Sequence, residues 1–417
     1  MSLLNRLRRL GRVMPFSPAV MHRLRRGASV GFRVAAYAKH GRSRRRQSPR
    51  PGPVCVAGFH GSVLGIGEAA RAFAAALRLA GAEVVEWDIS ALFGHEVRLD
   101  CTASPNPPPE AASLVVFLNP HELVQLVAMA GAEPFRGRFC AGVWFWELEQ
   151  VPKSWRTAMS YVDEVWAGSR FVAEAVARRA PAGLPVRILP CPIGRREAAP
   201  ERAAFGLPDD KVVVLTAFDV RSGFNRKNPI AAVRAFRLAN RDGKAVMVCK
   251  ATGVEGAPEQ VAALKAEIGE AGDVRLMTEW LTGGQMSALI ASADILLSLH
   301  RSEGFGLLPA QAMALGKAVV ATGWSANLDF MTANNSMLVD YRLVPVEDSQ
   351  GLYHGGRWAD PDVQDAAVKL VALIGDPVLR ARLGAQAAMD VAATLDPLVI
   401  GRTALAWLDA RPEDQTS

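Results

Sequence analysis

Short apolar runs alternate with helical segments along the chain from Pro53 onward. The runs typical of buried strands are Val54–Gly58, Val84–Trp87, Leu114–Leu118, Ala141–Trp146 and Glu164–Ala167. Between the first two, the pattern predicts a helix over Glu68–Leu79 that ends at Gly81. Strands that alternate with helices predict a parallel, doubly wound sheet.

The same alternation starts again near Phe205. Six further strands are predicted, at Val212–Phe218, Ala245–Lys250, Val274–Met277, Ile295–Leu299, Ala318–Ala321 and Met337–Val339. Helices are predicted at Pro229–Ala239 and Pro258–Gly269, and an amphipathic helix at Pro397–Leu408. We therefore expect an α/β fold of two Rossmann-like domains facing across a cleft, which is where small-molecule sites are favoured.

Composition agrees with an enzyme of two domains. The chain has 417 residues, and 50% of them are hydrophobic, enough for sizeable cores. Its five cysteines are scattered and form no CxxC pair, so we expect reduced thiols in a cytosolic protein and neither a disulfide framework nor a zinc site. No apolar run of the ~18 residues that a membrane-spanning helix needs is recognised in the sequence.

Positive charge is concentrated at the N-terminus. Residues 1–50 hold fourteen of the 48 Lys and Arg residues and none of the 41 Asp and Glu residues, so the remainder is net acidic. We interpret residues 1–52 as a basic tail and linker. Two roles stay open: a peripheral anchor on an anionic membrane surface, which would place the protein at the inner face of the membrane, or a disordered tail or misassigned translation start.

The tail does not indicate secretion, because no apolar segment follows its charges, although its Arg-rich, acid-free composition resembles a transit peptide. Nucleic-acid binding is not expected, because the globular part is acidic and no recognition motif accompanies the tail.

The stretch HRSEGFGLLPAQAMALGKAVVATGWSANLDFM, His300–Met331, carries the strongest chemical pattern. A predicted strand runs into Glu303 and a glycine-flanked loop, and a helix is predicted over Pro309–Leu315 with Pro309 at its first position. A helix N-terminus at the carboxyl end of a strand favours a phosphate. Glu303 carries the same charge sign as phosphate, so it is better suited to accept hydrogen bonds from hydroxyls. Phosphate and hydroxyls together indicate a nucleotide-sugar.

This stretch resembles the donor-binding signature of retaining GT-B glycosyltransferases, in particular glycosyltransferase family 4, EGFG-x-x-x-x-E-A-M-A-x-G-x-P-V. The matching residues are Glu303, Gly304, Phe305, Gly306, Ala312, Met313, Ala314, Gly316 and Val319, whereas Gln311 and Ala318 depart from the pattern. The resemblance extends to His60–Arg71, Trp144–Phe171, Ala217–Pro229 and Trp358–Asp362, and covers roughly residues 53–380.

The resemblance implies a GT-B fold: an acceptor-side domain over 53–204, a nucleotide-sugar domain over 205–385, and a helix and tail over 386–417 that cross back to the first domain. It implies transfer of a sugar, with retention, from a nucleoside-diphosphate-sugar to a hydroxyl of a glycan or lipid-linked acceptor in polysaccharide, lipopolysaccharide or glycolipid assembly. The donor-binding residues would include Gly304, Phe305, Gly306, Leu307 and Gln311.

Arg226 and Lys227 directly precede Asn228-Pro229, a favourable N-cap and N1 pair. Two cations at a helix start form an anion site, and cations aimed at a leaving diphosphate stabilise the transition state. The resemblance assigns this role to the pair, with Glu303 as the third catalytic residue; the alternative is a solvated basic turn. Lys250, at the end of the next strand, is a further donor-side candidate.

Gln311 stands where the family commonly has a glutamate that binds the ribose hydroxyls. A glutamine still accepts one hydrogen bond but loses the charge and adds a donor. The alternative is an enzyme weakened by drift.

The first domain offers further candidates after its strands. Gly65 and Gly67 would face the donor phosphates by resemblance, or form only a tight turn, since the GxG lacks the full GxGxxG spacing. Acceptor-side candidates, each with a structural alternative, are His60, His121, Trp146, Glu147 and Ser169. Trp144 and Trp146 lie on one face of the predicted strand Ala141–Trp146, and core packing is the favoured interpretation of both.

Asp360-Pro361-Asp362 is formally a DxD motif. We interpret Asp360 as an N-cap and Pro361 as the first helical residue, because a helix follows directly. No other cluster has metal-ligand spacing, so we expect metal-independent transfer and no cofactor besides the nucleotide-sugar co-substrate.

Two other functions remain. A nucleotide-sugar epimerase of similar fold would need its own acid/base constellation, which the sequence does not mark. A non-catalytic sugar-nucleotide-binding homologue has only Gln311 in its favour.

Overall fold

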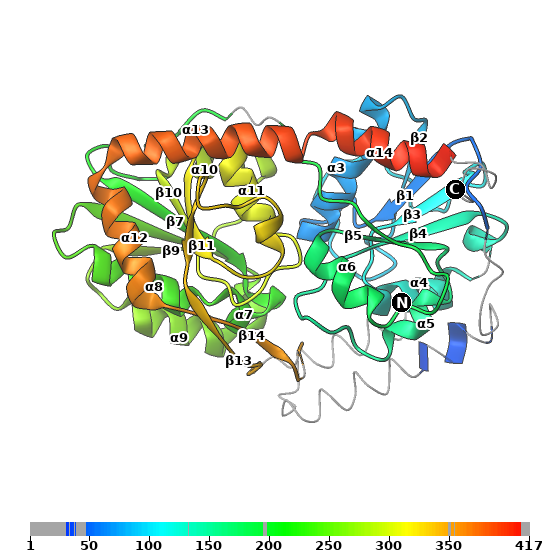
Figure 1. The fold of residues 1–417 in the computed structure, drawn as a ribbon, viewed down its shortest axis with the longest axis horizontal. Helices are drawn as coiled ribbons and strands as arrows, with labels where there is room; N and C mark the ends of the chain where they lie inside the picture. The colour runs from blue at the N-terminus through cyan, green and yellow to red at the C-terminus, as the bar shows by residue number, and fades with distance from the viewer. Residues whose placement is uncertain are drawn as a thin grey trace. The chain divides into compact units, whose positions relative to one another are not determined.

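The computed structural model describes residues 31–32, 34–36, 38, 47–131, 133–194, 198–348, 352–353 and 355–409. They belong to two compact units, the first within Met1–Pro192 and Leu395–Ser417 and the second within Ile193–Thr394 (Figure 1). The sequence pattern placed these divisions at 204/205 and 385/386. Most of the predicted basic tail, residues 1–52, lies outside the described residues.

The first unit is built on a six-stranded parallel sheet of order β2-β1-β3-β4-β5-β6. Its strands are β1 (Val54–Gly58), β2 (Val84–Asp88), β3 (Ser113–Val116), β4 (Phe139–Trp144), β5 (Glu164–Ala167) and β6 (Val186–Ile188). Its helices are α3 (Gly65–Leu79), α4 (Pro120–Ala130), α5 (Trp155–Met159), α6 (Arg170–Ala177) and α14 (Pro397–Asp409). The central strands are buried on both faces, as expected for a parallel sheet covered by helices.

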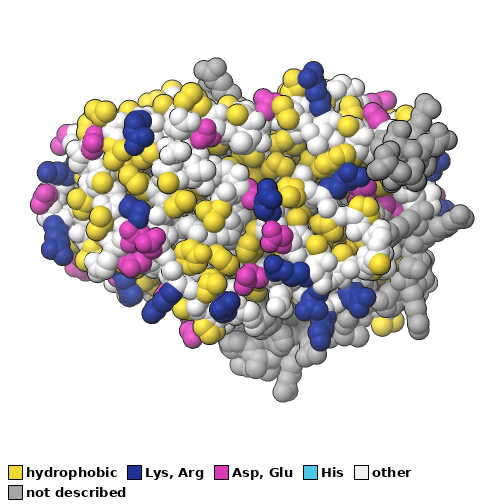
Figure 2. All heavy atoms as spheres, viewed as in Figure 1, with side chains coloured by type: hydrophobic (Ala, Val, Ile, Leu, Met, Phe, Trp, Pro, Cys, Tyr) yellow, Lys and Arg dark blue, Asp and Glu magenta, His cyan; other side chains and the backbone are white. Residues whose placement is uncertain are grey.

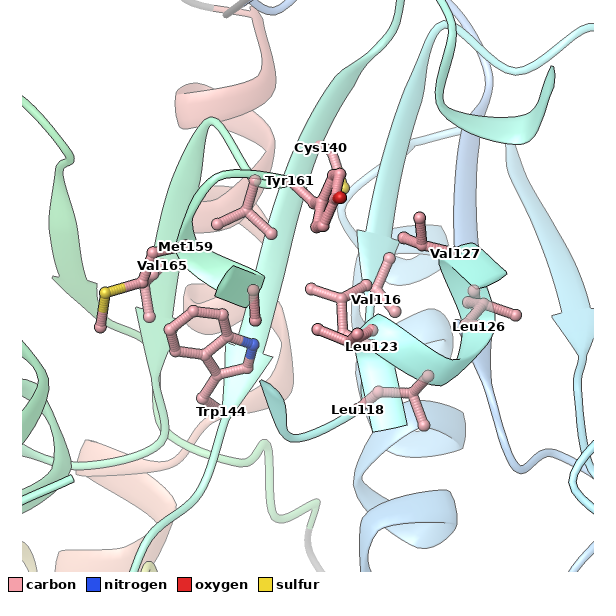
Figure 3. Packing of buried hydrophobic residues seen from close by; sticks show 14 of the residues in the cluster. Val116, Leu118, Leu123, Leu126, Val127, Cys140, Trp144, Met159, Tyr161 and Val165 are labelled. Carbon is pink, nitrogen blue, oxygen red and sulfur yellow. The ribbon is translucent and has the colours of Figure 1, made fainter. Parts of the chain in front are cut away.

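One face of this sheet packs a core in which residues of α4 and of the segment around α5 meet the strands (Figure 3). Trp144, the last residue of β4, is fully buried and contacts the ring of Trp155 at 5.6 Å. Gly142 leaves room for that indole, because a Cβ there would lie 2.6 Å from its Nε1. Helix α14 completes the unit by packing on α3, where Gly401 lies against the carbonyl of Ala76.

The second unit repeats the architecture with the order β12-β11-β10-β7-β8-β9. Its strands are β7 (Val212–Asp219), β8 (Ala245–Thr252), β9 (Val274–Met277), β10 (Ile295–Ser298), β11 (Ala318–Thr322) and β12 (Met337–Val339). Its helices are α7 (Phe224–Lys227), α8 (Pro229–Ala239), α9 (Pro258–Ile268), α10 (Gly283–Ser292), α11 (Leu307–Ala314), α12 (Val363–Gly375) and α13 (Pro377–Thr394). The chain adds strands in one direction from β7 and then in the other from β10, so the topological switch point lies between these two strands.

A two-stranded antiparallel hairpin was not predicted. It consists of β13 (Tyr341–Pro345) and β14 (Arg357–Pro361), and Figure 1 shows it at the edge of the second unit that also carries α7. The sequence gives little signal for it, because its strands mix charged, aromatic and proline residues.

Two boundary differences in the first unit change the place of candidate residues. Strand β4 is Phe139–Trp144 rather than Ala141–Trp146, so Trp146 follows the strand instead of lying in it. Helix α3 begins at Gly65, which places both glycines of the GxG in its first turn. Gly67 is required there, because a Cβ would collide with the carbonyl oxygen of Phe59.

One stretch, Pro377–Asp409, is long and apolar enough to cross a membrane by length and composition, with a mean hydropathy of 1.3. The sequence prediction recognised no such stretch. It consists of two helices, α13 and α14, and the buried residues Ile400, Ala404 and Leu408 of α14 belong to the helix that packs on α3. In all, 33% of its most apolar 18-residue window is buried within the structure.

The five cysteines are free thiols, and four are buried. Burial raises the pKa of Cys249 to about 12 and raises that of Cys55 and Cys191 further, so these thiols stay protonated and unreactive.

Candidate functional site

The switch point of the second unit brings together two segments far apart in the sequence. Helix α7 follows β7 after one short turn, and the loop His300–Gly306 follows β10. Because β7 and β10 are neighbouring parallel strands, both segments leave the sheet at the same edge. Open α/β sheets bind their ligands at this position.

Glu303, Lys227 and Arg226 form an ion-pair cluster at this edge. The ammonium of Lys227 lies 2.5 Å from Glu303 Oε1, and the guanidinium of Arg226 lies 3.1 Å from Oε2. Each carboxylate oxygen thus has its own cation. Glu303 and Arg226 are buried, whereas Lys227 keeps 23% of its side chain exposed.

The cluster holds Glu303 ionised. Burial alone would raise its pKa, but the charges of Lys227 and Arg226, with a smaller effect of His300, hold the pKa at about 2. Because the folded-state pKa lies below the usual 4.5, ionised Glu303 stabilises the fold above about pH 4.5, and this contribution is lost as the pH falls toward 2.

The stability difference between the wild type and Glu303→Gln should therefore depend on pH. We expect the wild type to be more stable above pH 4.5, by on the order of 3 kcal/mol, because the amide cannot pair with both cations. The difference should shrink as the pH falls toward 2, where the wild-type carboxyl is also neutral. Urea unfolding midpoints of both proteins across this range measure it, and a constant difference would contradict the assigned pairing.

Arg226 is held on every side by backbone carbonyls. Its Nε and Nη2 donate to Ser222 O at 3.2 and 2.8 Å, and Nη1 donates to Ser302 O at 2.8 Å. With its contact to Glu303, the guanidinium uses its donors inside the protein. Arg226 therefore orients Glu303, while the more exposed Lys227 retains access to a ligand.

The backbone between the two helices is specialised. Asn228 is the N-cap of α8 and has left-handed backbone angles (φ 52°), and Pro229 occupies the first helical position as predicted. The Asn228 side chain does not cap the helix but donates to Leu299 O at 3.1 Å, at the end of β10. This bond ties the α7–α8 junction to the strand that leads to Glu303.

A third segment closes on Glu303 from the end of β11. The Glu303 N–H donates to the hydroxyl of Ser325 at 2.8 Å. Ser325 has φ 77° and ψ −149°, a conformation that costs a non-glycine residue energy, and such strain concentrates at functional sites.

Helix α11 begins two residues earlier than predicted, at Leu307. Gly306, with φ 97°, is its N-cap, and Pro309 is its third residue, where the first-turn N–H has no partner in the helix anyway. Gln311 consequently lies in the second turn instead of the first, and it is buried. Phe305 faces the interior, with its ring 5.4 Å from that of Phe330. The first-turn amides of α11, starting at Leu307, still form an anion-binding helix end.

Lys250 lies within β8, which runs two residues further than predicted. Its side chain is buried, and its ammonium donates to Ala251 O at 3.3 Å. Burial lowers its pKa, with Glu279 and Asp219 acting in the opposite direction.

Sequence reasoning assigned no role to Arg221. It lies two residues after the end of β7, pairs with Asp219 at 2.6 Å, and has 56% of its side chain exposed. It is thus a second accessible cation at the carboxyl edge of this sheet. Its position shortly after a predicted strand, six residues before Lys227, was the available signal.

His300 was also missed. It is fully buried at the end of β10, and within the described part of the chain neither ring nitrogen has a hydrogen-bond partner. Its pKa is lowered to about 4. Burial is the main cause, Glu303 acts in the opposite direction, and the cations Lys227 and Arg226 add to the lowering. A neutral imidazole therefore stands beside the cluster at neutral pH.

In the first unit, the loop after β1 is fastened by Arg71 of α3. Its Nη1 donates to the carbonyls of His60 at 2.8 Å, Ser62 at 3.2 Å and Phe59 at 3.3 Å. The His60 ring is fully buried, is hydrogen-bonded to Val56 O at 2.9 Å, and lies 3.6 Å from a Glu86 oxygen. These contacts give His60 a role in closing the loop.

The remaining first-unit candidates lie at the carboxyl ends of β3, β4 and β5. Ser169 is the N-cap of α6 and accepts from Val172 N at 3.2 Å. His121 is exposed in the first turn of α4, with its ring 2.7 Å from the amide of Gln125. The cap of α4 is Asn119, whose side-chain oxygen accepts from Phe145 N instead of from the helix.

Trp146 packs on Trp155, with ring centroids 5.1 Å apart, and its Nε1 donates to Gln150 O at 2.9 Å. The adjoining Glu147 is half-buried. The tryptophan therefore has the packing role that the sequence favoured.

The DxD interpretation needs one correction. Asp360 is not an N-cap: it lies in β14 and pairs with Arg301 at 2.8 Å and Arg342 at 3.0 Å. The N-cap of α12 is Asp362, which accepts from Gln364 N and Asp365 N. The strand extends to Pro361 and so delays the helix by two residues. Within the described ranges no group of three or more His, Cys, Asp or Glu residues is arranged to hold a metal ion.

The segment that contains Arg226, Lys227, Glu303 and Gln311 matches a known family. Residues 211–355 match the family model described as Glycosyl transferases group 1. Over these residues the second unit is similar to a group 1 glycosyl transferase domain. No curated protein sequence matches the chain.

Solved structures extend the likeness, at the level of the fold, to the first unit. The chain resembles Anabaena Alr3699/HepE in complex with UDP and glucose, with TM-score 0.62, 15% identity, and 86% of this chain and 99% of that chain covered. It resembles sucrose-phosphate synthase from Thermosynechococcus elongatus, with TM-score 0.63, 16% identity, and 85% and 97% covered. It also resembles a glycosyltransferase from Rickettsia africae, with TM-score 0.59, 12% identity, and 88% and 98% covered. The two six-stranded parallel sheets are those of the GT-B fold.

Proposed function

We propose that this protein transfers a sugar, with retention at the anomeric carbon, from a nucleoside-diphosphate-sugar to a hydroxyl of a glycan or lipid-linked acceptor. The observation that carries the proposal is the Glu303–Lys227–Arg226 cluster at the switch point, inside the segment that matches group 1 glycosyl transferases. The UDP and glucose named for the Anabaena structure support a donor of this class.

The reaction breaks the bond between the anomeric carbon and a diphosphate oxygen. The acceptor oxygen attacks the same face of that carbon, and its proton passes to the departing diphosphate. Negative charge therefore grows on the diphosphate, and fixed cations stabilise this charge more in the transition state than in the ground state. Lys227 and Arg221 are the accessible cations at this edge, so the proposal requires no metal ion.

Glu303 is proposed to bind hydroxyls of the donor sugar. It stays ionised at neutral pH and accepts from Lys227 and Arg226, and a carboxylate has lone pairs for further donors. The amides that begin α11 are proposed to bind the diphosphate. Sugar and diphosphate then lie side by side at the end of β10.

Gln311 is proposed to lie near the ribose. Gln311→Glu should tighten donor binding by about 1 kcal/mol, because a carboxylate can accept from both ribose hydroxyls. Calorimetric titration of wild type and variant with the preferred donor measures it. Weaker binding would instead mean that the amide is adapted to this donor, and unchanged binding would contradict the proposed place of the ribose.

Binding of the donor class is tested by a thermal-shift panel of nucleotides and nucleotide-sugars. A ligand that binds only the folded state raises the apparent unfolding temperature. We expect one nucleoside diphosphate and its sugar conjugates to raise it in wild type, and less so in Lys227→Ala. No shift with any member of the panel would contradict the proposal.

A further inference from the structure

The β13–β14 hairpin is connected to the catalytic cluster through Arg301. The Arg301 N–H donates to Arg226 O at 2.7 Å, and its carbonyl accepts from Ala359 N of β14 at 2.9 Å. Its guanidinium pairs with Asp360 at 2.8 Å and lies 5.8 Å from the ring centre of Trp358. One residue therefore joins the hairpin to the backbone of Arg226.

A second connection runs through Tyr353, between the two hairpin strands. Its ring faces the guanidinium of Arg226 at 6.0 Å, within the range of cation–π contacts, and lies 6.1 Å from Trp358. Tyr353 is buried, and its N–H donates to the Asp348 carboxylate at 3.0 Å. The ring is thus fixed from behind by Trp358 while it faces Arg226.

A third connection joins the same loop to α7. The side-chain amide of Asn225 donates to Glu347 O at 3.0 Å. Gly223, the N-cap of α7, lies beside the tyrosine, since a Cβ there would be in ordinary contact with the Tyr353 ring at 3.4 Å. Glu347 and Tyr353 therefore both contact the segment that presents Arg226 and Lys227.

These three connections converge on Arg226, the residue that orients Glu303. Its guanidinium plane is fixed at the edges by Ser222 O, Ser302 O and Glu303. Hydrogen bonds in the plane leave the guanidinium able to tilt out of that plane. An aromatic ring that faces the plane, as Tyr353 does, restricts this tilt.

We propose that Tyr353 is a positioning residue, which acts through Arg226 to set the orientation of Glu303, and that the β13–β14 hairpin is the brace that holds it there. The inference rests on the proposed role of Glu303 in binding the donor sugar. It makes the brace selective: donor-sugar alignment depends on it, whereas binding of the diphosphate does not.

The test compares three full-length variants. Tyr353→Leu removes the aromatic face, Tyr353→Phe keeps it, and Tyr341→Leu makes the same change on the same hairpin where the ring contacts Trp324 at 5.4 Å instead of Arg226. We expect Tyr353→Leu to lower kcat with the preferred donor about tenfold, because small misplacements of a positioning group cost rate steeply. The affinity for UDP alone should change by less than about twofold in each variant, because the cations at the diphosphate stay in place. Tyr353→Phe and Tyr341→Leu should keep wild-type kcat.

Coupling is tested in the Glu303→Gln background. Because Tyr353 acts through Glu303, adding Tyr353→Leu there should cause no further loss of rate. An additive loss, or an equal loss in Tyr341→Leu, would overturn the proposal, since either would indicate a general effect on the hairpin.

Hydrogen exchange of the Arg301 amide is independent of catalysis. This amide bonds to Arg226 O, so its protection should fall about tenfold in Tyr353→Leu and remain in Tyr341→Leu. If wild type turned over no donor, the proposed function would fail, and this exchange measurement would still decide the brace. Unchanged protection in Tyr353→Leu would overturn it.

Discussion

Lys227→Ala should lower turnover of the preferred nucleotide-sugar by about 30-fold or more, the equivalent of about 2 kcal/mol of transition-state stabilisation. Lys227 is the member of the cluster with an exposed fraction of side chain, so its ammonium can serve both Glu303 and a departing diphosphate. The fold should survive, because Arg226 still pairs with Glu303. Steady-state kinetics with the donor found by the thermal-shift panel gives the measurement.

Lys244→Ala is the matched control. Lys244 is exposed, pairs with Asp242 at 3.5 Å, and directly precedes β8 at the amino edge of the sheet. Its removal should leave the rate within about twofold, as is usual for surface substitutions. Near-normal turnover in a folded Lys227→Ala protein would show that the leaving group is stabilised elsewhere.

Glu303→Ala should lower transfer about 100-fold or more, while the nucleoside diphosphate alone still binds. The carboxylate is proposed to hold the sugar, and the loss of a group that aligns the reacting centre is costly. Removing it also leaves Arg226 buried without its carboxylate, which should destabilise the fold by about 3 kcal/mol. Glu303→Gln keeps the shape of the side chain, and its rate is measured alongside that of the alanine variant.

Glu270→Ala, an exposed carboxylate after α9, is the control for charge. Calorimetry with the nucleoside diphosphate of the preferred donor and kinetics with that donor separate the two effects. A variant that loses nucleoside-diphosphate affinity and sugar transfer equally would place Glu303 at the phosphates instead of the sugar.

The sequence predicted the bounds of several strands and of one helix. β5 and β9 have the predicted bounds, and the helix at Pro229–Ala239 does too, because a proline start and a contiguous apolar pattern define it locally. Boundaries failed where tertiary contacts decide. Gly65 belongs to α3, because its turn is stabilised by the loop fastened to Arg71.

The sequence predicted which residues belong to the candidate site, but not how their side chains contact one another. The pattern around Glu303 identified it, and the paired cations were noticed beside Asn228-Pro229. The Arg226 guanidinium donates to the carbonyls of Ser222 and Ser302. Ser302 lies 76 residues from Arg226 in sequence, so no local pattern indicates this contact.

The hairpin escaped prediction for a similar reason. Asp360 reads locally as a helix cap, yet in the fold it pairs with Arg301 and Arg342. The pair with Arg301 forms only once β14 meets the segment after β10, and the pair with Arg342 only once β13 and β14 have paired. Tyr353 carries no local signal at all, and its contact with Arg226 emerges only from the fold.

The most direct test of the central claim is the fate of radiolabelled sugar in a panel of nucleoside-diphosphate-sugars incubated with the wild type and with Glu303→Gln. We expect the wild type to transfer or slowly hydrolyse the sugar of one donor and to release the nucleoside diphosphate. Glu303→Gln should do so at a strongly reduced, still measurable rate. Interconversion of the sugar while it stays on the nucleotide would indicate an epimerase, and binding of the donor without any turnover would indicate a non-catalytic homologue; either result would contradict the account.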